Sequence, residues 1–250
     1  MIRALSFLLL LIFPFSSFSQ NVNGLIQDAR QQESAFHENE AFLRYAEVLR
    51  LEPDNLVALC KCSELSSRIG ARQTGKEKMR EYFIAARNYA SRALRRDSSS
   101  SDANFVMALA LGRLSLIAGT RERIELARGI KKYAEISIRL DPSNFKPYHI
   151  LGKWNFEVSN LNVAEKSIAK IIYGGLPSAS LKQSIYYFEK SRSLNPAFLL
   201  NYLDLARAYH RNNNDKKAME LLHTLLGLPN MIYDDARVKT TANELIREWQ

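Results

Sequence analysis

The chain has 250 residues, a net charge of +9, and only ten glycines and seven prolines, about 7% together where an ordinary soluble protein carries about 12%. Because tight turns depend on these residues, the composition argues against a many-stranded sandwich or barrel and favours long helices. With 24% charged and 46% hydrophobic residues, the chain is neither a disordered tail nor a protein with many membrane spans, and its two cysteines exclude a disulfide framework.

Residues 1–19 have the pattern of a secretory signal peptide. Arg3 supplies a short basic start, residues 5–15 are almost wholly apolar, and small serines precede Gln20. The apolar run is shorter than the roughly 20 residues that a membrane-spanning helix needs. We therefore expect an exported protein, in the periplasm, the envelope or outside the cell, that starts near Gln20. The alternative is that residues 5–15 remain as an uncleaved membrane anchor.

A proline-containing segment follows three helical stretches further along the chain. These segments are RLEPDN at 50–55, RLDPSN at 139–144 and SLNPA at 193–197, and RRDS at 95–98 has Ser98 in the place of proline. Proline stops a helix because it lacks an N–H and its ring clashes with the preceding turn. Such self-similarity predicts a helical repeat.

Small or apolar residues recur at 12, 8 and 5 positions before each of these closing positions. They are Ala41, Tyr45 and Val48; Ala86, Ala90 and Ala93; Ile130, Ala134 and Ser137; Ser184, Phe188 and Ser191; and, one residue out of step before Pro229, Ala218, Leu222 and Leu225. Spacings of four and three place these side chains on one helix face. A face of small residues allows a neighbouring helix to approach closely.

The helix after each closing segment carries an aromatic residue followed by leucine and a small residue. The motif is YHILG at 148–152 and YLDLA at 202–206, with a weaker copy that ends at Leu111–Gly112. Together with the closing proline, it resembles the tetratricopeptide repeat, a pair of antiparallel helices. This resemblance implies an all-α fold, a tetratricopeptide-like α-solenoid of antiparallel helix pairs with a C-terminal capping helix.

We predict one repeat domain over residues 20–250. Its units are 22–66, 67–98, 102–142, 145–196 and 199–230, and its capping helix is 234–250. The closing positions are farther apart than the family period, which predicts lengthened helices or inserted loops in the middle units. The cap would cover the apolar face of the last pair, and Asp234 and Asp235 at its start suit the positive end of a helix.

The C-terminal half carries a more specific pattern. It contains YHILGKWNFEVSNL at 148–161, YGGLPSAS at 173–180 and IYYFEK at 185–190. Together these segments resemble the regulator of microtubule dynamics family over 133–250, whereas the N-terminal half resembles only a generic repeat. The resemblance implies association with microtubules and mitochondrial membranes, and lipid binding at membrane contacts. Because an exported chain would not meet cytosolic microtubules, we expect the fold to carry over better than this cellular role.

The sequence shows no constellation that predicts catalysis, a metal site or a bound cofactor, so we expect a protein that is not an enzyme. No two of the four histidines have metal-ligand spacing; they are His37, His149, His210 and His223. The pair Gly174–Gly175 lacks the lysine of a phosphate-binding loop and predicts a tight bend. Cys60 and Cys62 would point in different directions on a helix, which predicts packing of at least one thiol; a redox or metal-scavenging pair is the alternative.

Positive charge is concentrated between Arg68 and Arg96, where nine basic residues face two acidic ones. We single out a candidate patch for an anionic partner, made of Arg87, Arg92, Arg95 and Arg96. Such a segment attracts acidic peptides, phospholipid headgroups or nucleic acid, and the lack of a nucleic-acid-binding motif disfavours the last. The alternative is the solvated face of a long helix.

Two functions remain open. The first is a noncatalytic scaffold that binds a protein or peptide partner in a concave groove; its candidate contacts are Lys153, Asn155, Asn201, Asp204 and Arg207. The second is a module that binds or transfers a lipid or other apolar ligand at a membrane surface, as the family resemblance implies. It rests also on aromatic residues that equally suit a plain core, namely Trp154, Phe156, Tyr173, Tyr186, Tyr187 and Phe188.

If residues 1–19 are a cleaved signal, the protein isolated from its native source begins at or near Gln20. N-terminal sequencing or intact mass measurement checks this directly. A chain that begins at Met1 would contradict the prediction.

Overall fold

The computed structural model describes residues 16–173, 175 and 177–250, and within these ranges the chain forms helices and no strand. The helices are α1 (Ser16–Ser34), α2 (Glu38–Leu51), α3 (Leu56–Ala71), α4 (Lys76–Arg96), α5 (Ser101–Ser115), α6 (Thr120–Leu140), α7 (Phe145–Ser159), α8 (Val163–Tyr173), α9 (Leu181–Leu194), α10 (Leu199–Arg211), α11 (Asp215–Gly227) and α12 (Asp235–Trp249). The predicted anchor and most of the predicted signal peptide lie outside the described residues. Helix α1 begins before the predicted cleavage position near Gln20.

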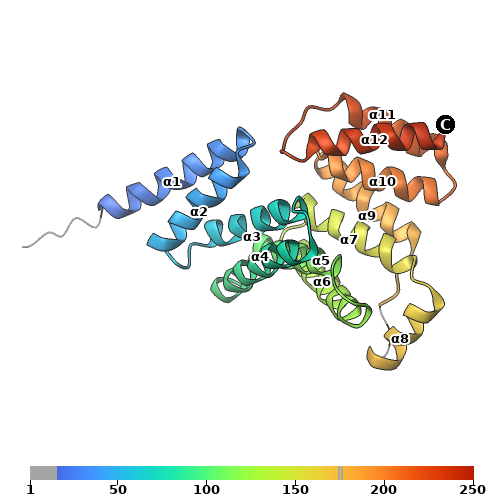
Figure 1. The fold of residues 1–250 in the computed structure, drawn as a ribbon, viewed down its shortest axis with the longest axis horizontal. Helices are drawn as coiled ribbons and strands as arrows, with labels where there is room; N and C mark the ends of the chain where they lie inside the picture. Colours follow the sequence, from blue (N-terminus) through green and yellow to red (C-terminus); the bar gives the residue numbers. More distant parts are fainter. Residues whose placement is uncertain (1–15, 174, 176) are drawn as a thin grey trace, which may run out of the picture.

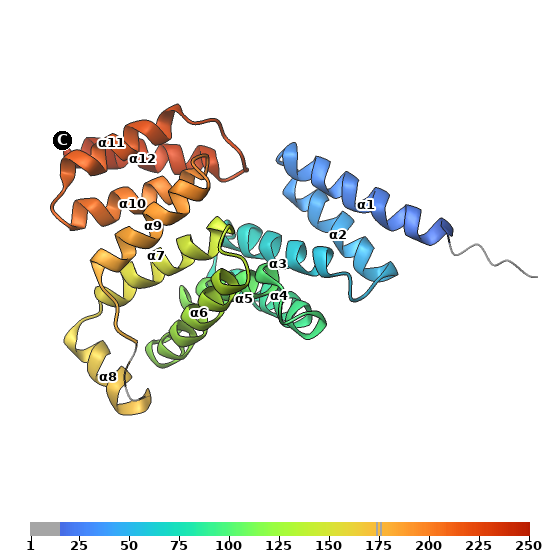
Figure 2. The same ribbon diagram turned by 180° about the vertical axis from the view of Figure 1, so that it is seen from behind.

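Five antiparallel helix pairs form the array: α1–α2, α3–α4, α5–α6, α7–α9 and α10–α11, with α12 packed on the last pair (Figure 1). The first helices of successive pairs contact one another, as α3 contacts α5, α5 contacts α7 and α7 contacts α10. The first helices therefore form the inner, concave layer. Both views show the array bending so that its two ends approach each other (Figure 2). The predicted solenoid with its capping helix is confirmed.

The predicted helix ends lie where the prolines require them. Helices α2, α6 and α9 end two residues before Pro53, Pro142 and Pro196, respectively. An asparagine then caps the helix that follows each of the first two prolines: the side chain of Asn55 accepts a hydrogen bond from the N–H of Ala58, and that of Asn144 from the N–H of Lys146, both at 3.1 Å. Local chemistry thus ends one helix and begins another within a few residues.

The predicted small-residue face of each second helix is buried in all five pairs. The three serines on this face also bond to the backbone of the first helix of their pair. Ser137 Oγ donates to the carbonyl of Ser101 at 2.8 Å. Ser184 Oγ donates to the carbonyl of Gly152 at 2.8 Å, and Ser191 Oγ donates to that of Phe145 at 3.0 Å. Because these side chains are short, the two helices of the pair lie close together and the buried hydroxyl groups remain satisfied.

Gly152 leaves room for the ring of Phe188 in the α7–α9 pair. A Cβ atom added at Gly152 would lie 2.5 Å from Cδ1 of Phe188, whose side chain is fully buried. Gly112, the glycine of the weaker motif copy, has no such close neighbour, because a Cβ atom added there would meet nothing within 4 Å. The buried small residue of α5 is Ala108. It lies eight residues after the N-cap residue of α5, which is the position that Gly152 holds in α7. The small-residue position of the weaker copy therefore lies four residues before the predicted glycine.

Two features account for the extra length of the middle units. Helices α4 and α6 each contain 21 residues, against 14 in α2 and α9. The fourth unit contains the additional helix α8, which contacts α6 and projects from the array. The predicted boundary at residue 66 is wrong, because it falls inside α3; the first two pairs are separated at 52–55, where Pro53 and Asn55 interrupt the helix.

The two cysteines are packed in α3. Cys60 and Cys62 are buried free thiols, and burial is the main reason that the pKa of each rises to about 12. This confirms the prediction of packed thiols. In the predicted Gly174–Gly175 bend, residue 174 lies outside the described residues, and Gly175 has a φ of 103° that favours glycine.

No helix in the described part of the chain combines the length and the apolar character needed to cross a membrane.

Replacing Gly152 with alanine should destabilise the protein by about 1–3 kcal/mol, because the added methyl group overpacks against the buried ring of Phe188. The matched control is Gly112→Ala, which adds the same group in a helix without a close neighbour and should stabilise by about 0.5–1 kcal/mol. Urea unfolding followed by circular dichroism measures both variants. Equal stability of the two would contradict the close-packing argument.

Candidate functional site

Charged side chains form a set of separate ion-paired clusters on the concave side of the array. We call it the concave charge network and define it by Glu33, Glu38, Lys61, Glu64, Arg68, Arg72, Lys146, Lys153, Asp204, Arg207 and Asp234. At its N-terminal end, Glu33 of α1 accepts from Lys61 at 2.8 Å and from Arg68 at 3.1 Å. The buried carboxylate of Glu38 pairs with Arg68 at 3.3 Å and with Arg72 at 2.6 Å. Each of these carboxylates is thus shared by two cations.

One ion pair joins the two ends of the bent array. Arg72, which follows α3, lies 3.1 Å from Oδ2 of Asp234, directly before α12. The guanidinium group of Arg72 also lies over the ring of Tyr233, 4.6 Å from its centroid. The second helix pair is therefore linked to the loop that leads into the capping helix, across 162 residues of sequence.

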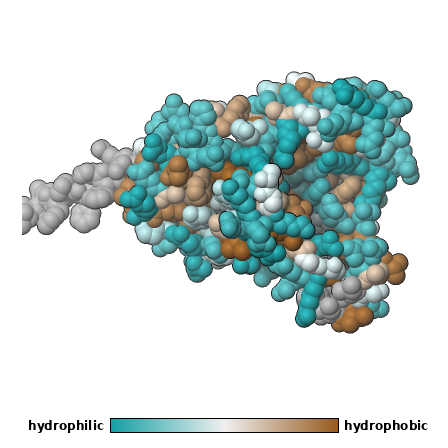
Figure 3. Space-filling view, in the orientation of Figure 1, coloured by the Kyte–Doolittle hydropathy of each residue, from teal (hydrophilic) through white to brown (hydrophobic). Residues whose placement is uncertain are grey.

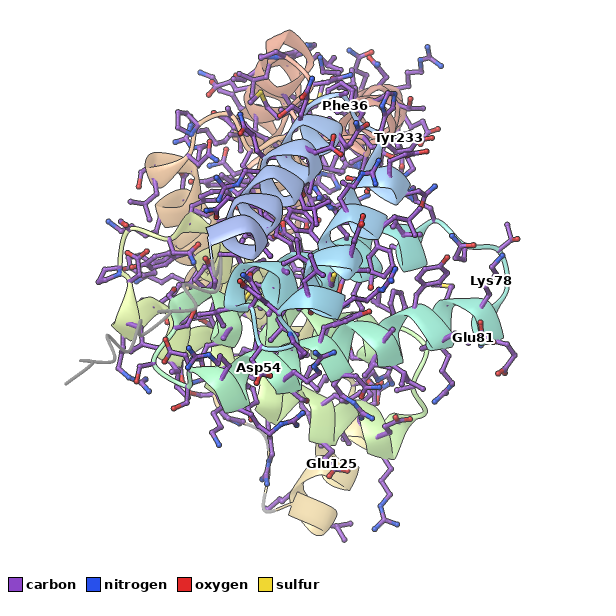
Figure 4. The ribbon with its side chains drawn as sticks, turned by 90° about the vertical axis from the view of Figure 1, so that its left-hand side faces the viewer. Phe36, Asp54, Lys78, Glu81, Glu125 and Tyr233 are labelled. Carbon is purple, nitrogen blue, oxygen red and sulfur yellow. The ribbon has the colours of Figure 1, made fainter. Side chains whose placement is uncertain are left out.

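A cleft of about 620 Å³ lies at this junction, between the α1–α2 turn and the α11–α12 loop. Its lining includes Phe36, Arg72, Tyr233, Asp234 and Arg237. Phe36 and Tyr233 keep 37% and 55% of their surface exposed, and they appear at the same end of the molecule in Figure 4. The cleft thus combines two exposed aromatic rings with charged groups.

The middle of the network crosses from α3 to α7. Lys146 Nζ donates to both carboxylate oxygens of Glu64, at 3.0 and 3.2 Å. Burial alone would raise the pKa of Glu64, but the positive charges of Lys146, Arg68 and Lys61 outweigh it and lower the pKa to about 2. Glu64 is therefore ionised at every physiological pH.

The C-terminal end of the network is centred on Asp204 of α10. Its Oδ1 lies 3.4 Å from Lys153 and 3.2 Å from Arg207, and its Oδ2 lies 3.7 Å from His149. Burial would raise the pKa of Asp204, but Lys153, His149 and Arg207 lower it overall. Burial lowers the pKa of His149 despite the attraction of Asp204, so this imidazole is neutral at pH 7.

The structure brings three of the five predicted groove contacts together, namely Lys153, Asp204 and Arg207. Asp204 is itself 5% exposed, and the remaining two are also buried. Asn201 has no exposed surface; its amide donates to the carbonyl of Phe188 at 2.9 Å, and its Oδ1 lies 3.1 Å from His149 Nδ1. Asn155 is 3% exposed and donates to the carbonyl of Leu151. The prediction of these two as groove contacts is wrong, because polarity in sequence does not distinguish a solvated amide from one bonded inside the protein.

Sequence reasoning missed Arg113 of α5, which is half-buried in this region. Its Nε is buried without a hydrogen-bond partner. Burial lowers the pKa of Arg113; the carboxylates of Asp234 and Asp204 oppose that effect, while Arg237 and Arg68 add to it. Its position in the repeat could have identified it from the sequence. Arg113 lies thirteen residues after the N-cap residue Ser100, and Arg68 lies thirteen residues after the N-cap residue Asn55.

The predicted basic patch lies on α4 but does not form one free surface. Arg92 donates to the carbonyl of Pro53 and lies over the ring of Tyr89. Arg96 lines a second cleft of about 560 Å³ together with the acidic residues Glu52, Asp54 and Asp97. The exposed residues Arg87 and Arg95 remain solvated on the helix. A backbone contact thus engages Arg92, and acidic residues lie in the same cleft as Arg96.

The aromatic residues that suggested an apolar ligand divide between core and surface. Trp154 is buried and donates its indole N–H to the carbonyl of Ala127 at 2.7 Å, and Phe188 is fully buried in another core cluster. Tyr186 is 62% exposed, and the side chain of Tyr173 lies outside the described residues. Figure 3 shows that the visible face is mostly hydrophilic, with apolar groups gathered at α8, where Val163 and Ile171 are exposed.

Within the described residues, no three histidine, cysteine or acidic side chains come together as a possible metal site.

Glu64→Gln should destabilise the protein by about 2–3 kcal/mol at pH 7, because it leaves Lys146 half-buried without an anion. The folded-state pKa of about 2 lies below the ordinary value of 4.5. The contribution of Glu64 is therefore complete above about pH 4.5 and is lost as pH falls toward 2. Urea unfolding at pH 7, 5 and 3 should show the difference from the unmodified protein shrinking.

The control for this measurement is Glu125→Gln, on the exposed surface of α6 (Figure 4), which should change stability by less than about 0.5 kcal/mol at each pH. A Glu64→Gln effect that stays constant from pH 7 to pH 3 would contradict the assigned ionisation.

Comparison with known proteins agrees with this architecture. Residues 25–250 match the family model described as regulator of microtubule dynamics protein 1-3. The match extends the resemblance well beyond 133–250, so the interpretation of the N-terminal half as only a generic repeat is wrong.

Two relatives illustrate the similarity. The chain is 29% identical over 175 residues to regulator of microtubule dynamics protein 1 of Mus musculus, covering 70% of this chain and 57% of that protein. It is 25% identical over 196 residues to the Caenorhabditis elegans protein of the same name, covering 78% and 84%. The aligned part thus spans little more than half of the mouse relative.

A solved structure shows the fold independently. The crystal structure of a thermophilic tetratricopeptide repeat protein of Thermus thermophilus matches with a TM-score of 0.67 at 12% identity, over 90% of this chain and 99% of that one. Family sequence and repeat architecture therefore agree along nearly the whole described chain, and we conclude that it belongs to the regulator of microtubule dynamics protein 1-3 family.

Proposed function

We propose that the protein is a noncatalytic scaffold that binds a protein or peptide partner on its concave side. The observation that carries this proposal is the concave charge network, which lines the inner helices from α1 to α10. A curved inner surface of this kind suits an extended partner segment. Fixed charges on such a surface select partners and orient them.

The protonation states of the network support binding rather than acid–base catalysis. Glu64 and Asp204 have lowered pKa values and stay ionised, and His149 has a lowered pKa and stays neutral. A catalytic acid or base works best with a pKa near the operating pH. Groups held in one charge state over the physiological range instead provide a stable electrostatic pattern.

Family membership favours a second, more specific candidate. The relatives are named as regulators of microtubule dynamics, and tubulin or a tubulin-associated protein is accordingly a candidate partner of this chain. Co-sedimentation of the purified chain with polymerised tubulin tests this candidate.

Export through residues 1–19 is a separate proposal that rests on the sequence pattern alone, and a chain exported in this way would bind a partner outside the cytoplasm. A lipid or other apolar ligand is the remaining alternative, and native mass spectrometry of the purified protein would detect it as a bound species.

Site-specific photo-crosslinking tests the concave surface directly. A photoreactive amino acid in place of Lys153, which is 39% exposed in the network, should capture the partner from native extract. The same residue in place of Lys78, exposed on α4 (Figure 4), is the control for the outer surface and should capture far less. Mass spectrometry then identifies the captured segment.

The second arm of this experiment uses the identified partner in purified form. Arg207→Ala should weaken its affinity at least about tenfold, because a cation beside Asp204 is lost. Equal crosslinking at positions 153 and 78, or an unchanged affinity of the Arg207→Ala variant, would count against concave binding.

A further inference from the structure

We propose that Arg113 anchors the bound partner by pairing with a carboxylate side chain of an acidic peptide. This inference rests on the proposed scaffold function and specifies its ligand. It assigns the partner segment an acidic residue that reaches Arg113, in the last turn of α5.

The first argument comes from two arginines in the same repeat position. Arg68 and Arg113 each lie thirteen residues after the N-cap residue of their helix. Arg68 forms ion pairs with two carboxylates, those of Glu33 and Glu38, although its Nε, like that of Arg113, makes no hydrogen bond. In the part of the chain that the structure describes, Arg113 has no carboxylate within ion-pair distance, and its buried Nε has no hydrogen-bond partner. The same position thus has its anion in one unit and lacks it in the next.

The second argument is energetic. A buried donor without a partner costs about 1–3 kcal/mol, and an unpaired buried charge costs more. Burial already lowers the pKa of Arg113, which reports that its charged form is poorly stabilised. The planar guanidinium group offers two parallel N–H donors that match a carboxylate. An incoming carboxylate would therefore satisfy both the charge and the donors.

The third argument is the charge of the surroundings. Asp204 and Asp234 are the carboxylates that act on Arg113, and each already pairs with other cations: Asp204 with Lys153 and Arg207, and Asp234 with Arg72 and Arg237. Arg68 and Arg237 add positive charge near Arg113. The network thus has more cations than carboxylates at its centre, which attracts an anion.

The cleft at the junction of the two ends, which Arg113 itself does not line, favours a peptide over a phospholipid. Asp234 and Arg237, two of the charges that act on Arg113, line the cleft at the junction of the two ends. The exposed rings of Phe36 and Tyr233 in that cleft suit single apolar side chains of an extended peptide. The charged groups beside them would be costly neighbours for an acyl chain.

The test measures binding of a fluorescein-labelled peptide, Tyr followed by six Glu, to the full chain by fluorescence anisotropy at low salt. Arg113→Gln removes the charge while keeping a polar side chain, and it should weaken binding at least tenfold. Asp234→Asn removes a competing anion and should strengthen binding several-fold. Arg95→Gln, on the exposed surface of α4, is the matched control for loss of one positive charge and should leave the affinity nearly unchanged.

Thermal unfolding separates this role from a structural one. If Arg113 is a half-buried cation without an anion, Arg113→Gln unfolds at the same or a higher temperature, whereas a structural role would lower the unfolding temperature. Equal peptide affinity of Arg113→Gln and Arg95→Gln would overturn the proposal. So would Arg113-dependent binding to vesicles of phosphatidylserine and phosphatidylcholine without binding to the peptide. Crosslinking at position 153 that survives Arg113→Gln, with unchanged affinity, would refute this inference while the scaffold function stands.

Discussion

The close approach of the two helices in each pair is the constraint on which the rest of the structure depends. Gly152 admits the ring of Phe188, and Ser184 bonds to the glycine carbonyl itself. Bulkier residues at these positions would separate the helices and expose the buried hydroxyl groups. Because the pairs are tight, neighbouring first helices contact one another, and the array bends toward them.

The bend places charged residues from distant parts of the chain in one partly buried surface. Charges there have fewer water molecules to stabilise them, and most of the carboxylates pair with two or more cations. Glu38 and Asp204 each contact two or more. Such shared pairs hold the ends of the array together through Arg72 and Asp234 and keep the protonation states of the surface constant. The same surface leaves Arg113 without an anion, which gives the scaffold an electrostatic preference.

The family relationship and the structure describe different aspects of the protein. The match over residues 25–250 shows the family to which the chain belongs. The tetratricopeptide-like array shows which helices form its concave surface. The regulator of microtubule dynamics name belongs to the relatives; in this chain, the concave charge network is the feature through which a partner would be selected. The inserted helix α8, exposed at Val163 and Ile171, distinguishes the fourth unit from its neighbours.

The sequence by itself determined where helices end and which faces are buried, because a proline such as Pro142 and the spacing of Ile130, Ala134 and Ser137 act within one or two helical turns. It also carried the family pattern of the C-terminal half. Only the tertiary structure decided which polar residues are available: Asn201 is bonded inside the core, whereas Arg113 is left without an anion. The pairing of Arg72 with Asp234 likewise depends on the curvature of five stacked pairs, and no local pattern specifies a contact between residues 162 positions apart.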